Sequence, residues 1–98
     1  MRLLLVVSSP GKVSYVEGLA NAAARAGHEV SVFFNEEAVK LLKSPSPVEY
    51  LYADLLSCRA SSKEYGITKD CLAANARMSS LAELVDLLEE ADKVVFLG

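Results

Sequence analysis

Residues 3–34, which read LLLVVSSPGKVSYVEGLANAAARAGHEVSVFF, decide the fold of this chain. Residues 3–7 form a short, continuous apolar run, which is typical of a strand buried on both faces. Residues 12–26 have the pattern of a helix, and Gly27 stands where a left-handed cap would end that helix. Residues 29–34 form a second apolar strand. A strand, a helix and a strand in this order predict a parallel pair joined by a right-handed crossover.

The middle of the chain continues the same pattern in shorter pieces. Asn35 is placed to cap a short helix that begins directly after it. The Ser-Pro-Ser-Pro sequence at residues 44–47 breaks the chain and predicts a loop. Residues 51–56 are predicted as a third strand, and residues 59–65 as a small helix that Gly66 stops.

The last third of the chain predicts one more helix and one more strand. Residues 67–77 show no clear period, after which Ser80 and Glu83 form a capping box. The apolar face of the helix that follows consists of Leu81, Leu84, Val85, Leu88 and Ala91. We expect its other face to be a solvated surface, carrying Glu83, Asp86, Glu89 and Glu90. Residues 94–97 predict a final buried strand.

These elements predict a three-layer α/β sandwich around a mostly parallel sheet of four to five strands, as a single domain over residues 1–98. The composition agrees, because 52% apolar and 23% charged residues exclude a disordered chain. No apolar run approaches the roughly 18 residues of a membrane span. The apolar run at residues 3–7 is also too short for the core of a secretory signal. We therefore expect a cytoplasmic protein that makes no membrane contact.

The charged and metal-binding residues exclude two further classes of function. Ten Lys and Arg stand against 13 Asp and Glu, for a formal net charge of −3, so we expect no direct nucleic-acid partner. Two cysteines and one histidine are too few for a four-ligand structural zinc site, and we expect no metal. The chemistry that remains is that of a thiol.

Cys58 is the one nucleophile at a predicted strand end. Ligands of open parallel sheets bind beyond the carboxyl ends of the strands, and Cys58 lies between the third strand and the helix after it. A thiol at a helix N-terminus feels the partial positive charge of free N–H groups, which favours the thiolate. Arg59 and Lys63 add positive charge, and Ser61 offers a hydroxyl that can donate to the sulfur. A buried structural cysteine at a strand end fits the position equally well.

Three thiol motifs can be compared with this segment by counting. A phosphatase-type C-x5-R loop fails, because the arginine position is occupied by Glu64. A monothiol C-x-x-S redox motif survives, with Ser61 as its serine, but no proline is suitably placed to be the cis-proline that accompanies it. A rhodanese-type loop that cradles a persulfide is imitated by the short segment from Cys58 to Lys63.

A resemblance to a known family covers nearly the whole chain. Its first part is GHEVSVFF at residues 27–34, and its second is CRASSKEYGI at residues 58–67, where a cysteine that closes a central strand precedes Gly-Ile. Its last parts are MSSLAEL at residues 78–84 and ADKVVF at residues 91–96. In these features the chain resembles the DsrE/DsrF-like family.

The resemblance implies a small α/β protein that carries sulfur. Family members that have the cysteine hold sulfur as a persulfide and transfer it to a protein partner. Carried onto this chain, the carrier is Cys58. From the residues themselves, we expect Arg59, Lys63 and the backbone N–H groups of the segment that ends at Gly66 to stabilise the anionic sulfur. The chain would then be an intracellular sulfur carrier or sulfurtransferase subunit, with sulfur donor and acceptor proteins as partners and no cofactor.

A non-catalytic, oligomeric protein that binds a small ligand is the alternative on the same fold. Its pocket would use Ser9, Gly11 and Asn35 at the strand ends, where backbone N–H groups can bind an anion. Cys71 is a second thiol, able to resolve a bond to Cys58 only if the two Cα atoms lie within about 7 Å. His28 is predicted at the opposite end of the sheet and outside the site.

The helix at residues 12–26 has a polar stripe too narrow for a surface helix, because almost all its other residues are apolar or small. Exposed apolar area of this kind usually marks an interface. Family members form dimers, trimers or hexamers. We therefore expect a homo-oligomer, either a dimer or a trimer.

Overall fold

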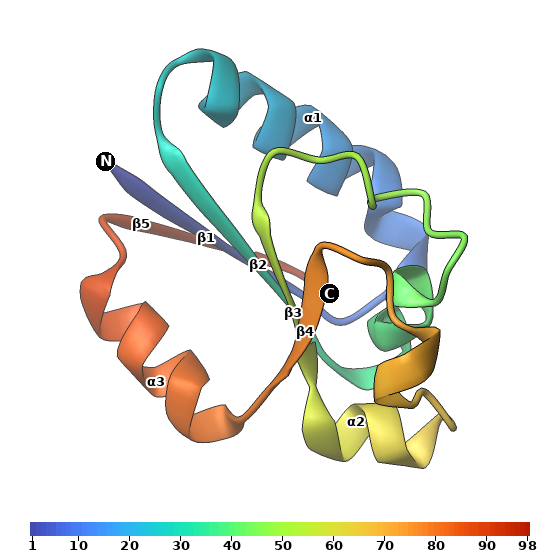
Figure 1. Ribbon diagram of the computed structural model, residues 1–98. Helices are drawn as coiled ribbons and strands as arrows, with labels where there is room; N and C mark the ends of the chain where they lie inside the picture. Colours follow the sequence, from blue (N-terminus) through green and yellow to red (C-terminus); the bar gives the residue numbers. More distant parts are fainter.

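The computed structural model describes all residues, Met1–Gly98, and its centre is a five-stranded sheet in which every pair of neighbours is parallel (Figure 1). The strand order is β4-β3-β2-β1-β5. The bounds of the strands are β1 (Arg2–Val7), β2 (Glu29–Phe34), β3 (Asp54–Cys58), β4 (Ala76–Ser79) and β5 (Lys93–Leu97).

Helices lie on both faces of this sheet. Helix α1 (Val13–Arg25) covers one face, α3 (Leu81–Glu90) lies on the other, and the short α2 (Arg59–Glu64) sits beyond the end of β3 (Figure 1). Three 3-10 turns complete the chain, namely η1 (Pro10–Lys12), η2 (Glu36–Leu42) and η3 (Lys69–Cys71). The predicted α/β sandwich with a parallel sheet is confirmed.

The opening strand, helix and strand form as their sequence predicts. β1 pairs with β2 from Arg2 opposite Glu29 to Val7 opposite Phe34. Gly27 takes the left-handed conformation (φ 84°) and ends the turn after α1, and the His28 N–H then donates to the carbonyl of Ala23 at 3.0 Å. The predicted left-handed cap at Gly27 is therefore confirmed.

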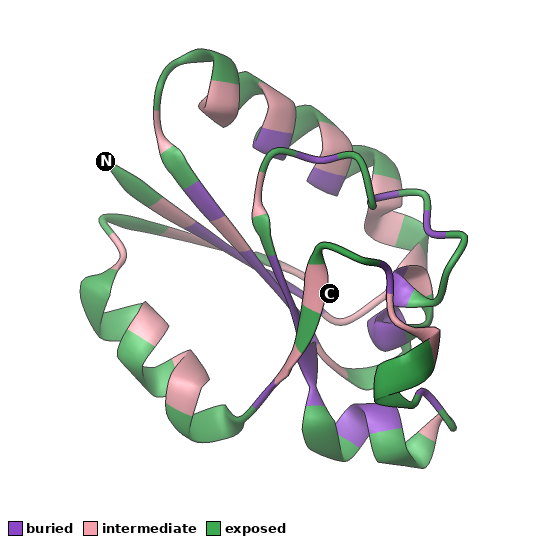
Figure 2. Ribbon diagram, in the orientation of Figure 1, coloured by how far each residue is buried: buried purple, intermediate pink, exposed green.

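The core lies in the central strands, which are the most completely buried part of the ribbon in Figure 2. Val32, Phe33, Phe34, Leu55 and Leu56 have no exposed surface. Because successive strand residues point to opposite faces, β2 and β3 are buried on both sides. Each such side chain contributes roughly 1.5–3 kcal/mol of hydrophobic free energy.

The third and fourth strands differ from their prediction. The third strand was predicted at residues 51–56, but β3 begins at Asp54 and ends at Cys58. Leu51 is buried in the turn before it, where its N–H donates to the Val48 carbonyl, so apolar character there reflects burial without a strand. β4 was not predicted; it begins at the end of the region in which no period is visible, and a four-residue edge strand is too short to show an alternation.

The outer elements are less buried than predicted. Leu84, Leu87 and Ala91 pack against the core, whereas Leu81, Val85 and Leu88 of the predicted apolar face of α3 are exposed. β5 pairs only with β1, contains no buried residue and leaves Phe96 69% exposed, so the prediction of a buried last strand is wrong. An edge strand has one strand neighbour, and a single helix cannot cover it fully.

None of the helices combines the length and the apolar character that a membrane span would need.

Two glycines make a matched pair for testing the α1 region. A Cβ added at Gly18 or at Gly27 would meet no other atom within 4 Å, so only backbone conformation separates the two sites. Gly18→Ala inside α1 should stabilise the fold by about 0.5–1 kcal/mol, because alanine favours the helix. Gly27→Ala should destabilise it by about 1–2 kcal/mol, because φ is 84° there. Urea unfolding measures the change in the free energy of unfolding for both variants. Changes of the same sign would contradict the different backbone conformations assigned to Gly18 and Gly27.

Candidate functional site

The carboxyl ends of the parallel strands meet at one edge of the sheet and bring several polar residues there. Ser8 follows β1, Asn35 follows β2, and Cys58 is the last residue of β3. In the register of the sheet, Cys58 lies opposite Ser79 at the end of β4. This is the edge at which ligands of open parallel sheets bind.

Cys58 occupies the N-cap position of α2, with an extended backbone conformation (φ −60°, ψ 121°). The residue is 4% exposed and belongs to the apolar core cluster. It also lines a cavity of about 410 Å³ between α2 and the start of α3, which we call the thiol cavity. The other residues that line the thiol cavity are Arg59, Ala60, Lys63, Ser80 and Leu81. Two cationic side chains therefore share the cavity with the cysteine.

Buried hydroxyl groups hold α2 in place behind the cysteine. Ser57 and Ser62 share a hydrogen bond of 2.6 Å between their hydroxyls, which ties β3 to α2. Ser61 Oγ accepts a hydrogen bond from the Glu36 N–H at 2.9 Å, which ties α2 to the start of η2. The predicted donation from Ser61 to the Cys58 sulfur is absent from the structure. Ser61 instead positions the helix that carries Arg59 and Lys63.

A second cavity adjoins the thiol cavity, and we call it the basic groove. It encloses about 640 Å³ between α2, the turn after it and β4, and it shares Arg59 and Lys63 with the thiol cavity. Its remaining lining residues are Ser62, Gly66, Ile67, Thr68, Lys69, Arg77 and Met78. Gly66 has φ 68° and turns the chain at the end of α2, as its sequence position predicts. The lining contains four cationic side chains and no carboxylate.

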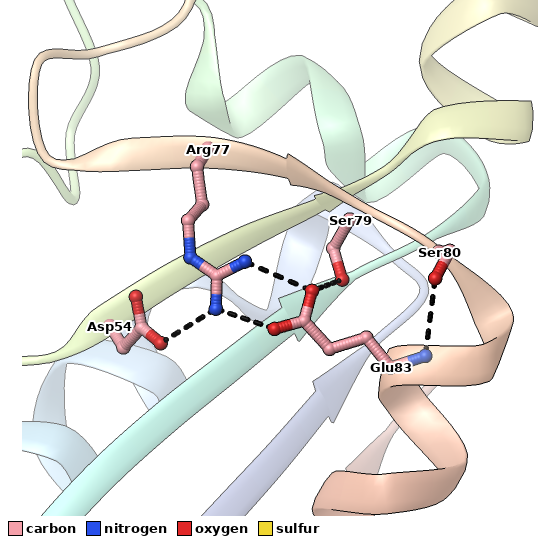
Figure 3. A network of polar contacts seen from close by, with 5 residues as sticks. All are labelled: Asp54, Arg77, Ser79, Ser80 and Glu83. Atoms are coloured by element: carbon pink, nitrogen blue, oxygen red, sulfur yellow. Dashed lines mark hydrogen bonds and ion pairs between the residues drawn. The ribbon is translucent and has the colours of Figure 1, made fainter.

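A polar network at the end of β4 ties the edge strand to its neighbours (Figure 3). The Arg77 guanidinium donates to both carboxylate oxygens of Glu83, at 2.9 and 2.6 Å, and to Asp54 at 3.3 Å. Ser79 Oγ donates to Glu83 Oε1, while the Glu83 N–H donates to Ser80 Oγ at 3.1 Å. The Ser80 half of the predicted capping box is confirmed. The Glu83 side chain turns to Arg77 and Ser79 instead of closing the box.

The network changes the ionisation of its members. The hydrogen bonds from Arg77 and then Ser79 lower the pKa of Glu83 from 4.5 to about 2. The same contact with Glu83 raises the pKa of Arg77. The predicted solvated face is confirmed for Asp86, Glu89 and Glu90, which are exposed. Glu83 is half-buried instead, because the strand-to-helix connection folds Arg77 onto it.

The second cysteine lines neither cavity, but it contacts Thr68 of the basic groove. Cys71 ends η3, and its sulfur accepts a hydrogen bond from the Thr68 N–H at 3.3 Å and lies 3.0 Å from Thr68 Oγ1. The side-chain contact with Thr68 is the main cause that lowers the pKa of the Cys71 thiol, and the Thr68 N–H adds to it. Both cysteines are free thiols. Neither the residue pattern nor the spacing of the sequence indicates this local hydrogen bonding.

The other residues named from the sequence divide into two groups. Ser9, Gly11 and Asn35 lie at the carboxyl edge but line neither the thiol cavity nor the basic groove. Asn35 does not cap η2 with its side chain, because its Oδ1 accepts a hydrogen bond from Ser8 Oγ at 2.6 Å. His28 lies at the opposite end of the sheet, with Nδ1 3.1 Å from the N-terminal amine.

Glu83→Gln should lower the free energy of unfolding by about 1 kcal/mol at neutral pH, because the network is partly exposed and loses one charge. The pKa of Glu83 is lowered on folding, so its stabilisation is fully present above 4.5 and is lost as the pH falls toward 2. Urea unfolding across that pH range should show that the difference in the free energy of unfolding between the variant and the wild type becomes smaller as the pH falls. Glu89→Gln on the exposed side of α3 is the control, with little expected effect. A difference in the free energy of unfolding that does not change with pH would contradict the lowered pKa of Glu83.

Comparisons with known proteins agree with this architecture. The family model described as the DsrE/DsrF-like family matches residues 1–97. The chain is similar in structure to the ychN protein from E. coli, with a TM-score of 0.79 and 16% identity over 99% of this chain and 100% of that one. It is similarly close to MTH1491, a protein of unknown function from Methanobacterium thermoautotrophicum, with a TM-score of 0.79 and 14% identity over 97% of each chain. No curated protein matches the sequence significantly. Because the family model spans nearly all of the sequence and the fold agrees, the chain belongs to the DsrE/DsrF-like family.

Proposed function

We propose that this chain is a cytoplasmic sulfur carrier or sulfurtransferase subunit that holds a persulfide on Cys58 and passes the outer sulfur to a protein partner. The family is generally related to sulfur relay, which supports the class of chemistry. The observation that carries the proposal is the position of Cys58. It ends a central strand at the carboxyl edge and lines a cavity together with Arg59 and Lys63.

The proposed reaction is a pair of thiol exchanges at one sulfur atom. The Cys58 thiolate attacks the outer sulfur of a donor persulfide, the donor S–S bond breaks, and the donor leaves as a thiolate. Cys58 then bears the persulfide as an anion. An acceptor thiolate attacks that outer sulfur, and Cys58 is released as a thiolate. Each bond formed replaces one broken, so neither step needs an oxidant or a reductant.

The surroundings of Cys58 suit the bound form of the sulfur. A cavity of about 410 Å³ has room for one additional sulfur atom beside the thiol. Arg59 and Lys63 line that cavity and supply positive charge to an anionic persulfide. The 4% exposure of Cys58 limits its contact with solvent, so a donor or acceptor has to reach it through the cavity. Thiol exchange depends on this access as well as on the thiolate fraction.

A non-catalytic small-ligand-binding protein is the second candidate. The burial of Cys58 within the apolar core favours it, because a small buried thiol at a strand end is a common structural residue. On this reading the two cavities bind an anion, and Cys58 contributes only packing. The loading experiment below separates the candidates.

Incubation with a cysteine desulfurase and cysteine should add the mass of one sulfur atom to the intact protein. Cys58→Ser should abolish the gain, whereas Cys71→Ser should retain it, and a reductant should remove the added sulfur. Cys71 is the matched control because it is a second free thiol with a lowered pKa that lies outside both cavities. Sulfur found only on Cys71, or no added sulfur, would reject the carrier function and favour ligand binding.

We also propose that the chain assembles as a homo-oligomer. Helix α1 buries only Val16 and Ala20, and leaves Tyr15 59% and Leu19 37% exposed. Four further apolar side chains are exposed on α3 and β5, namely Leu81, Val85, Leu88 and Phe96. Apolar area that the single chain leaves uncovered is a common feature of interfaces between subunits.

Light scattering at micromolar concentration should give a mass of two or three times the 10.5 kDa chain. Leu19→Glu should dissociate the oligomer if α1 forms the interface, because a buried unpaired charge is costly. Val85→Glu makes the same test for the exposed apolar side chains of α3 and β5, so each variant is a control for the other. A monodisperse 10.5 kDa species of the wild type would contradict the proposal.

A further inference from the structure

The basic groove concentrates positive charge on an acidic protein. Four of the ten Lys and Arg residues line it, namely Arg59, Lys63, Lys69 and Arg77, while the whole chain has a net charge of −3. The nearest carboxylates by sequence, Glu64 and Asp70, are exposed and do not line the groove. Charge of one sign gathered along a low-dielectric wall attracts ligands of the opposite sign.

Most of this charge is not neutralised within the chain. Arg59, Lys63 and Lys69 are exposed and make no ion pair, whereas Arg77 is paired with Asp54 and Glu83. By contrast, Arg2 and Lys40, away from the groove, each contact a carboxylate of the chain. Three cationic side chains of the groove therefore remain available to an external anion.

The groove also offers apolar contact and hydroxyl groups. Ile67 is almost fully buried and Met78 half-buried, and both contribute to the lining. The hydroxyls of Thr68 and Ser62 also line the groove, where each already contacts a neighbour, Cys71 and Ser57 respectively. A segment of polypeptide that combines carboxylates with apolar side chains matches this lining. Glu64, Asp70 and the acidic surface of α3 disfavour a long, uniformly charged polyanion such as a nucleic acid.

The groove adjoins the thiol cavity, because Arg59 and Lys63 line both. A segment that lies in the groove is therefore next to the cavity that Cys58 lines. We propose that the basic groove docks an acidic segment of the partner protein that exchanges sulfur with Cys58. The exchange of sulfur with Cys58 rests on the proposed function. The docking of an acidic segment depends only on the groove.

The docking is measured with a fluorescein-labelled peptide that contains four glutamates, one leucine and a terminal cysteine. A peptide with four glutamines in place of the glutamates is its control. Fluorescence anisotropy is recorded on a protein that carries both Cys58→Ser and Cys71→Ser, so that no covalent exchange contributes. At a low salt concentration of about 20 mM the glutamate peptide should bind at least about tenfold more tightly, and this preference should vanish near 500 mM.

A substitution at Lys69 is the most informative test of the groove, because Lys69 lines the groove but not the thiol cavity. Lys69→Glu should abolish the preference for the glutamate peptide, and Lys69→Arg should preserve it. Lys93→Glu on the exposed edge strand β5 changes the charge of the protein equally at a distance from the groove, and should leave most of the preference intact. Urea unfolding of the three variants verifies that their stabilities remain similar.

The exchange step is tested on the Cys71→Ser protein, in which Cys58 is the one remaining thiol, with the same peptides activated as mixed disulfides. The glutamate peptide should react with Cys58 about tenfold faster than the glutamine peptide at low salt, and Lys69→Glu should remove the difference.

Equal binding of the two peptides, an unaffected Lys69→Glu protein, or tighter binding of an oligouridylate of matched charge would overturn the docking proposal. Docking without faster exchange would overturn the link between the groove and Cys58. A failed persulfide loading together with normal peptide binding would reject the proposed function and leave the acidic-segment site standing.

Discussion

Burial of both faces of the central strands is the constraint on which the rest of the structure depends. Val32, Phe33 and Phe34 follow one another along β2, and none of them is exposed. Because their side chains alternate in direction, the strand needs protein above and below it and a strand on each side. Helical crossovers meet this need by keeping all five strands parallel. Parallel strands end at one edge, so the same constraint brings Cys58 together with the residues that follow the other strands.

The site at that edge combines a protected thiol with accessible charge. Packing of β3 into the core buries Cys58. Arg59 is the next residue and Lys63 follows about one helical turn later on α2, and both remain exposed. Hydrogen bonds from β3 and from the start of η2 hold α2 at this position. Specificity for a partner can therefore depend on the exposed cations, while reactivity depends on access to the buried sulfur.

The edges of the sheet are stabilised in different ways. On one side, Arg77 links β4 to Asp54 of β3 and to Glu83 of α3 (Figure 3), which compensates for the short pairing of this strand. On the other side, β5 has no such network and leaves Phe96 exposed, as are Leu81 and Val85 of α3. The first edge borders the basic groove, and the second has exposed apolar side chains available for subunit contact.

The sequence by itself determined the fold class, the β1–α1–β2 unit, the turn at Gly27, the small helix after Cys58 and the place of that cysteine at a strand end. These features arise from local patterns, because apolar runs, a helical period and turn residues act over a few positions. Only the tertiary structure decided the limits of β3, the existence of β4, the exposure of α3 and β5, the contact of Glu83 with Arg77, and the gathering of Lys69 and Arg77 with the cations of α2. Each of these depends on which distant residues the sheet brings together, and the pattern within one segment does not indicate which other segments will contact it.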